Sequence, residues 1–194
     1  MTDHKLLTVI IFMMFSQLSI AQYSYEPSLE YPFGKPNPEA PEEIKGYDAL
    51  IGLCNCKSET KGPDGSWNEP VPMTWRFKYI MNGWGVQDET LKEDGTYSGS
   101  IRQYNTDSSK WYVHYYTSAN VSPQLSSWEG SRNSDGNIVL YRKQKAPNGM
   151  DGFYRLTFYG IDESGYKWIG EWVSPDESVI FPTWKISCTR NIGE

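Results

Sequence analysis

Tight-turn signals recur along most of this chain, and they limit the regular elements between them to short ones. Asn82-Gly83 is the strongest of these signals, because both residues tolerate the positive φ values that a two-residue β-hairpin turn requires. Asp94-Gly95 and Asp135-Gly136 continue the pattern. A spacing of about 8–12 residues between turns leaves little room for helices and predicts an all-β fold.

Residues between these turns alternate in the way that a half-buried strand requires. From 73 to 81, the aromatic residues Trp75, Phe77 and Tyr79 are separated by the cations Arg76 and Lys78. Aromatic residues make up 15% of the chain, and such side chains suit pleated strands better than helices. The alternation therefore predicts strands with one buried and one solvated face.

The predicted strands follow one another along the chain with tight reversals between them. They cover residues 49–59, 73–81, 84–92, 96–104, 111–117, 124–132, 138–144, 153–161, 166–173 and 181–190. Consecutive hairpins favour an up-and-down meander, and closure of a meander removes exposed strand edges. We expect a single up-and-down antiparallel β-barrel of about eight to ten strands.

The first residues have the features of a secretory signal peptide. Lys5 precedes an apolar run from Leu6 to Phe15, and small residues up to Ala21 suit a signal peptidase. The run is shorter than the ~20 apolar residues that span a bilayer. We expect residues 1–21 to be removed between Ala21 and Gln22, leaving an exported, periplasmic or secreted protein without an integral membrane segment.

Residues 22–46 are rich in proline and poor in aliphatic side chains, so they cannot form a core of their own. They are expected to form an arm or linker in front of a barrel domain at residues 47–194. Aromatic residues of the arm, such as Tyr31 and Phe33, could dock on that domain. A helical turn is expected over Pro41 to Asp48, because proline is tolerated at a helix start.

Charge and composition exclude several function classes. The formal net charge is −6, which gives no basic surface for nucleic acid. After removal of the signal peptide, His114 is the single histidine, which argues against a histidine-rich metal site. We expect no metal and no cofactor, and we expect His114 to have a structural or surface role.

Three cysteines in an exported chain suggest one disulfide and one remaining thiol. Cys54 and Cys56 are two positions apart, so on a strand they share a face and do not readily bridge each other. Either of them can pair with Cys188.

Short segments spread over about three quarters of the chain carry a resemblance to a known group of proteins. They are Leu-Ile-Gly at 50–52, Met-Asn-Gly at 81–83, Val-Gln-Asp-Glu at 86–89, Ser-Ile-Arg-Gln-Tyr-Asn at 100–105, Lys-Trp-Tyr-Val at 110–113, Trp-Glu-Gly at 128–130, Trp-Ile-Gly-Glu at 168–171, Thr-Trp at 183–184 and Thr-Arg at 189–190. In order and spacing they resemble a bacterial family of lipocalin-like barrels within the calycin group. The resemblance implies a barrel with an internal cavity and no established activity.

The resemblance also implies a strand register. Calycins begin with Gly-x-Trp, whose Trp packs against an Arg of the last strand, and here Cys54 stands in the Trp position. If Cys54 faces Arg190, then Cys56 faces Cys188, which predicts a Cys56–Cys188 disulfide with Cys54 free. A register slip of two residues would give Cys54–Cys188 instead.

Candidate ligand-binding residues are those that alternation places together on strand faces. Arg102 and Tyr104 share one face, and Trp84 and Asp88 share a face of the neighbouring strand. An inward Arg102 with Asp88 nearby would orient the polar group of an amphipathic ligand. The alternative is a solvated ion pair on the outer face.

Four further aromatic residues are candidates for the ligand-contacting wall of the barrel. They are Trp111, Tyr115, Trp168 and Trp172. They are either ordinary core residues or stacking surfaces for a flat ligand. We therefore expect a protein that binds a small apolar or amphipathic molecule in a barrel cavity.

Two alternative functions use the same residue types. One is a calycin-type isomerase or hydrolase that uses Arg102 with acidic residues, for which Asp88 and Glu171 are candidates. The other is recognition of carbohydrates or surface proteins by exposed aromatic residues, which predicts a contiguous outer patch of tryptophans.

Overall fold

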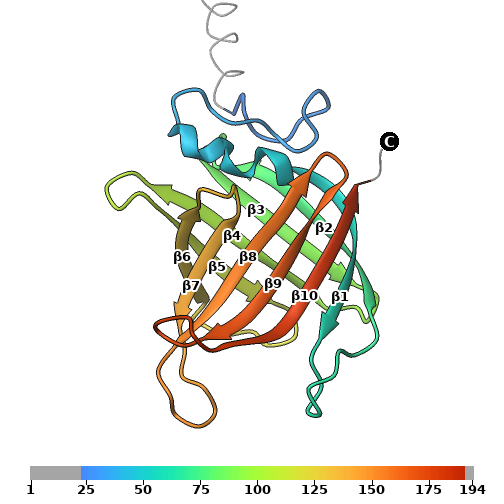
Figure 1. Ribbon diagram of the computed structural model, residues 1–194. Coiled ribbons are helices and arrows are strands. Elements are labelled where there is room, and N and C mark those ends of the chain that lie inside the picture. Colours follow the sequence, from blue (N-terminus) through green and yellow to red (C-terminus); the bar gives the residue numbers. More distant parts are fainter. Residues whose placement is uncertain (1–22, 191–194) are drawn as a thin grey trace, which may run out of the picture.

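Ten antiparallel strands form a closed barrel in the computed structural model, which describes residues 23–190 (Figure 1). The strands are β1 (Gly52–Thr60), β2 (Val71–Ile80), β3 (Gly85–Lys92), β4 (Tyr97–Asn105), β5 (Lys110–Thr117), β6 (Ser126–Arg132), β7 (Ile138–Lys143), β8 (Phe153–Asp162), β9 (Gly165–Val173) and β10 (Ile180–Arg190). Each strand pairs with its neighbours in sequence, and β1 pairs with β10 to close the ring. The predicted all-β, up-and-down barrel is confirmed.

Alternation in the sequence becomes the inside and outside of the barrel. In β2, Trp75, Phe77 and Tyr79 are buried, whereas Arg76 is exposed on the outer face. Burial of the inward aromatic side chains supplies the main hydrophobic stabilisation of such a barrel.

The β2–β3 hairpin turns where the sequence predicts it. Met81, Asn82 and Gly83 all have positive φ, of 56°, 52° and 81°. A side chain at Gly83 would lie 2.4 Å from the backbone nitrogen of Asn37, which belongs to the N-terminal arm. Glycine is therefore required there both for the turn and for the close approach of the arm.

The β1–β10 seam has the register that the resemblance implies. Cys54 lies opposite Arg190, and Cys56 lies opposite Cys188. Cys56 and Cys188 form a disulfide, while Cys54 is buried and carries a free thiol. The seam is thus closed by both backbone hydrogen bonds and a covalent bond, and the alternative pairing of Cys54 with Cys188 does not occur.

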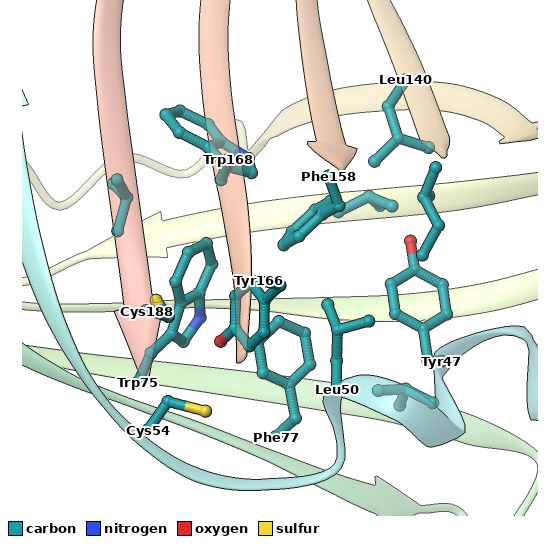
Figure 2. Packing of buried hydrophobic residues seen from close by; sticks show 14 of the residues in the cluster. Tyr47, Leu50, Cys54, Trp75, Phe77, Leu140, Phe158, Tyr166, Trp168 and Cys188 are labelled. Carbon is teal, nitrogen blue, oxygen red and sulfur yellow. The ribbon is translucent and has the colours of Figure 1, made fainter. Parts of the chain in front are cut away.

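One end of the barrel is closed by the 3-10 helix η1 (Glu42–Leu50), which lies across the strand ends (Figure 1). Ile44, Tyr47 and Leu50 of η1 are almost completely buried. Tyr47 meets Trp111 edge to face, with 4.7 Å between the ring centroids. Figure 2 shows Tyr47 and Leu50 among the rings that fill this end, including Phe77. We call η1 with these side chains the plug.

The arm before the plug is docked on the β2–β3 hairpin. The Tyr79 amide donates to the Phe33 carbonyl oxygen at 2.8 Å, and the Asn37 amide donates to the Gly83 carbonyl oxygen at 3.2 Å. The side-chain oxygen of Asn82 accepts a hydrogen bond from the Tyr25 amide. These bonds hold the arm against the closed end of the barrel.

The expected signal peptide, residues 1–21, lies outside the described residues. Within residues 23–190, no helix is both long and apolar enough to cross a membrane.

Candidate ligand-binding cavity

A cavity of about 310 Å³ lies inside the barrel, beyond the plug and toward the opposite end. Its lining includes Lys92, Ser126 and Trp184, which stand near the strand ends farthest from η1. No residue of η1 lines it. The volume falls at the lower end of the range of about 300–1,000 Å³ typical of small-molecule sites.

One wall of the cavity is formed by tryptophan rings. Trp75 of β2 and Trp168 of β9 have ring centroids 6.4 Å apart, and Trp168 and Trp184 of β10 are 5.1 Å apart. Both pairs meet edge to face, which is a favourable arrangement of aromatic rings. Figure 2 shows Trp75 and Trp168 beside Phe158 in this part of the barrel. This wall offers a flat apolar ligand extensive contact.

The neighbouring wall, from β3 and β4, is polar. Thr90, Ser98 and Ser100 line it, and the hydroxyl oxygens of Thr90 and Ser98 are 2.6 Å apart. Their positions follow from strand alternation, since β3 and β4 place every second side chain inward. The cavity is therefore amphipathic in cross-section.

A buried ion pair lies in the polar wall, and a hydrogen bond ties it to the tryptophan wall. Arg102 Nη1 donates to Asp88 Oδ1, and Trp75 Nε1 donates to the second carboxylate oxygen, Oδ2, at 2.7 Å. The side chains of Arg102 and Asp88 are only 3% and 4% exposed. Of the two arrangements that the sequence left open, the structure has the inward one, and the solvated ion pair on the outer face is excluded.

Aromatic rings surround the guanidinium of Arg102 on the side facing the plug. Its central carbon lies 4.9 Å from the ring centroid of Phe77 and 5.2 Å from that of Tyr47. Burial disfavours the charge of Arg102, but Asp88 and Tyr47 together more than offset this, so the pKa of Arg102 is raised above its usual value. Arg102 is therefore a permanent cation whose charge is balanced by Asp88.

Two further cations lie at the cavity. The guanidinium carbon of Arg142 is 4.4 Å from the ring centroid of Trp128, and Lys92 Nζ is 4.8 Å from the centroid of Trp184. All four side chains line the cavity. Each cation lies over an aromatic face, an arrangement stabilised by the ring quadrupole.

Four of the eight candidate ligand-binding residues line this cavity. They are Asp88, Arg102, Tyr115 and Trp168. Asp88 and Arg102 are in direct contact, whereas Tyr115 and Trp168 come from β5 and β9.

The other four candidates lie elsewhere. Trp111 packs on Tyr47 of the plug, and Tyr104 packs on Trp111 with 5.6 Å between ring centroids. Trp172 is buried and donates from Nε1 to the Gln144 carbonyl oxygen. Trp84 precedes β3, is 43% exposed and does not share the inward face of Asp88.

Several cavity residues were not singled out from the sequence. The main ones are Trp75, Trp128, Arg142 and Trp184. The alternation of each predicted strand carries the signal for their inward orientation. Arg142 has a weaker signal, because it follows the apolar residues of β7, where a cation at a strand end is ordinarily solvated.

The acidic pair considered for catalysis is divided by the barrel wall. Asp88 points into the barrel, whereas Glu171 pairs with Arg155 at 2.8 Å, and both of these line a groove outside the cavity. His114 is half-buried and contacts the Ser127 hydroxyl at 2.8 Å. Within residues 23–190, no group of three or more His, Cys, Asp or Glu side chains could hold a metal ion.

Tryptophans do not form an outer recognition patch. Of the eight, Trp75, Trp111, Trp128, Trp168 and Trp172 are buried, and Trp184 lines the cavity. Of the remaining two, Trp67 is half-buried and Trp84 is 43% exposed.

Comparison with solved structures identifies the fold. Rv2717c from M. tuberculosis superimposes with a TM-score of 0.51 at 10% identity, over 79% of this chain and 99% of that chain. This chain folds as a lipocalin-like barrel. The phycobiliprotein lyase CPES from Guillardia theta gives a TM-score of 0.47 at 8% identity, over 79% of this chain and 98% of that chain. No protein-family model matches the sequence of the lipocalin-like barrel, and no curated protein matches it.

Proposed function

We propose that this lipocalin-like barrel is an exported protein that binds a small amphipathic molecule in its cavity, without covalent chemistry. The observation that carries the proposal is a cavity with a tryptophan wall beside a polar wall that holds the buried Arg102–Asp88 pair. Such sites are mostly apolar, with a few placed polar groups that orient the ligand.

Stability alone does not account for the ion pair. Replacing a buried ion pair by apolar side chains of similar volume is often neutral or stabilising, because desolvation of two charges is costly. A pair retained at a cavity wall is consistent with a role in ligand orientation. Export is supported by the signal-like residues 1–21 and by the Cys56–Cys188 disulfide, which is typical of oxidising compartments.

Filling the cavity tests the proposal. Ser100→Phe places a ring in the cavity, whereas Gln103→Phe places the same ring on the outer face of β4. Thermal unfolding would be followed with a panel of aromatic and aliphatic amphiphiles, and circular dichroism would confirm that both variants fold.

We expect some amphiphiles to stabilise the wild type and Gln103→Phe but not Ser100→Phe. A ligand at about 100 times its Kd adds about 2.7 kcal/mol of stability. Each kcal/mol corresponds to about 2–4 °C in Tm for a chain of this size. The proposal would be contradicted if the amphiphiles stabilised Ser100→Phe as much as Gln103→Phe. It would also be contradicted if no compound of the panel stabilised the wild type.

A further inference from the structure

The charges that line the cavity do not balance. Lys92, Arg102 and Arg142 are cations, and Asp88 is the single acidic lining residue. Asp88 is already paired with Arg102. The cavity therefore carries two further positive charges inside a chain whose net charge is −6.

Arg142 is half-buried, and it has no acidic partner among the described residues. Its guanidinium donates to the Gln144 side-chain oxygen at 2.6 Å and stacks on Trp128. Burial lowers the pKa of Arg142, and no carboxylate counters that effect. Arg155 on the next strand differs, because Glu171 and Glu177 both pair with it.

Two hydrogen-bond donors at the cavity also lack partners. Trp128 Nε1 and Arg102 Nε are buried nitrogens with no hydrogen-bond partner in residues 23–190. Both residues line the cavity, and Trp128 and Arg102 are 8% and 3% exposed. Indole and guanidinium nitrogens only donate, so the partner that would satisfy them is an acceptor oxygen.

We infer that the ligand is a compact aromatic carboxylate whose anionic group binds to Arg142 and to Trp128 Nε1. This rests on the proposed function and names the ligand class of the same cavity. Guanidinium groups bind planar carboxylates well, because their parallel N–H groups match the two oxygens. The rings of Trp75 and Trp168 contact the aromatic body, and the small volume favours fused rings over a long chain.

The test compares 2-naphthoate with 2-naphthamide, which has nearly the same shape but no charge. Binding would be measured by titration calorimetry and by quenching of the cavity tryptophans. Arg142→Gln removes the cation to which we assign the carboxylate. Lys143→Gln is the matched control, since it removes the same charge from the next, exposed residue of β7.

We expect the wild type and Lys143→Gln to bind 2-naphthoate at least about tenfold more tightly than 2-naphthamide. Arg142→Gln should lose this preference while still binding the amide. Trp128→Phe keeps the ring but removes Nε1, and it should weaken 2-naphthoate binding by about tenfold or more, as expected for one hydrogen bond to a charged group.

Two results would overturn the inference. Equal affinity of the wild type for 2-naphthoate and 2-naphthamide would show that the cavity does not select an anion, while leaving the binding function in place. A preference for 2-naphthoate that persists in Arg142→Gln would place the anion elsewhere. Failure of the proposed function is recognised separately, in the thermal-unfolding panel. It would be shown if no amphiphile stabilised the wild type more than Ser100→Phe.

Discussion

The Arg102–Asp88 pair shows how much a single substitution inside the barrel should matter. Asp88→Ala leaves the Arg102 charge buried without a partner and removes the acceptor of Trp75 Nε1. Breaking a buried pair on one side costs about 3–5 kcal/mol. We expect that loss in the free energy of unfolding, measured by urea denaturation.

A double variant provides the control for this prediction. Asp88→Leu with Arg102→Met removes both charges and fills similar volume, so it should recover most of the loss. A double variant as unstable as Asp88→Ala would show that the pair itself, and not an uncompensated charge, stabilises the barrel.

At the level of residues, the sequence predicts which side chains face inward but not how deep they lie. Alternation places Trp111 and Tyr115 on the same inward face of β5, as the structure has them. Trp111 nevertheless packs on the plug, whereas Tyr115 lines the cavity. The depth of a side chain along the barrel axis depends on strand tilt and on the plug. The alternation of inward and outward residues along a strand contains no information on either.

At the level of elements, the ten strands of the structure match the predicted ranges closely. The signals were local, since alternation and turn residues such as Asn82-Gly83 act within a few positions. The sequence also predicted a helical turn near residues 41–48, where η1 begins. It did not predict that η1 closes the barrel, because burial of Tyr47 depends on strands more than 20 residues away.

The plug leads to a prediction about Tyr47. Its hydroxyl is buried without a well-formed hydrogen bond in the described residues, although it interacts with the Arg102 guanidinium, and its ring contacts Trp111 and Phe77. Tyr47→Phe removes a buried hydroxyl that makes no well-formed hydrogen bond, so it should leave stability within about 1 kcal/mol of the wild type or raise it. Tyr47→Ala removes the ring and should cost about 3–5 kcal/mol.

Chemical denaturation of both Tyr47 variants would check this prediction. A large loss in Tyr47→Phe would mean that the hydroxyl has a partner, such as a buried water. A small loss in Tyr47→Ala would mean that the plug contributes little to the closed barrel.

For the whole molecule, acid sensitivity should come from the turns. Several turns are closed by an aspartate that accepts hydrogen bonds from nearby backbone amides or serine hydroxyls. These residues are Asp64, Asp94, Asp162 and Asp176. Hydrogen bonds from Ser174 and Ser178 lower the pKa of Asp176 to about 2, and similar bonds lower the pKa of the other three.

The sign of the pH dependence follows from these lowered pKa values. A carboxylate with a folded-state pKa below its unfolded value of about 3.9 stabilises the fold above that pH. The stabilisation is lost as the pH falls from about 4 toward 2. We expect Tm from scanning calorimetry to fall steeply in this window, and Asp176→Asn to reduce the slope because asparagine accepts hydrogen bonds without titrating. If Tm fell as steeply with pH in Asp176→Asn as in the wild type, the attribution of acid sensitivity to Asp176 would be contradicted.

The disulfide between β1 and β10 holds the two fragments together when the chain is cut between its cysteines. Cys56 and Cys188 are 132 residues apart, so nearly every loop of the barrel lies between them. A single cut by a protease in any of those loops leaves both pieces joined by the disulfide. Each piece also stays hydrogen-bonded to its neighbour along the seam. The nicked protein would run as one band on a gel until a reductant is added, and only then as two.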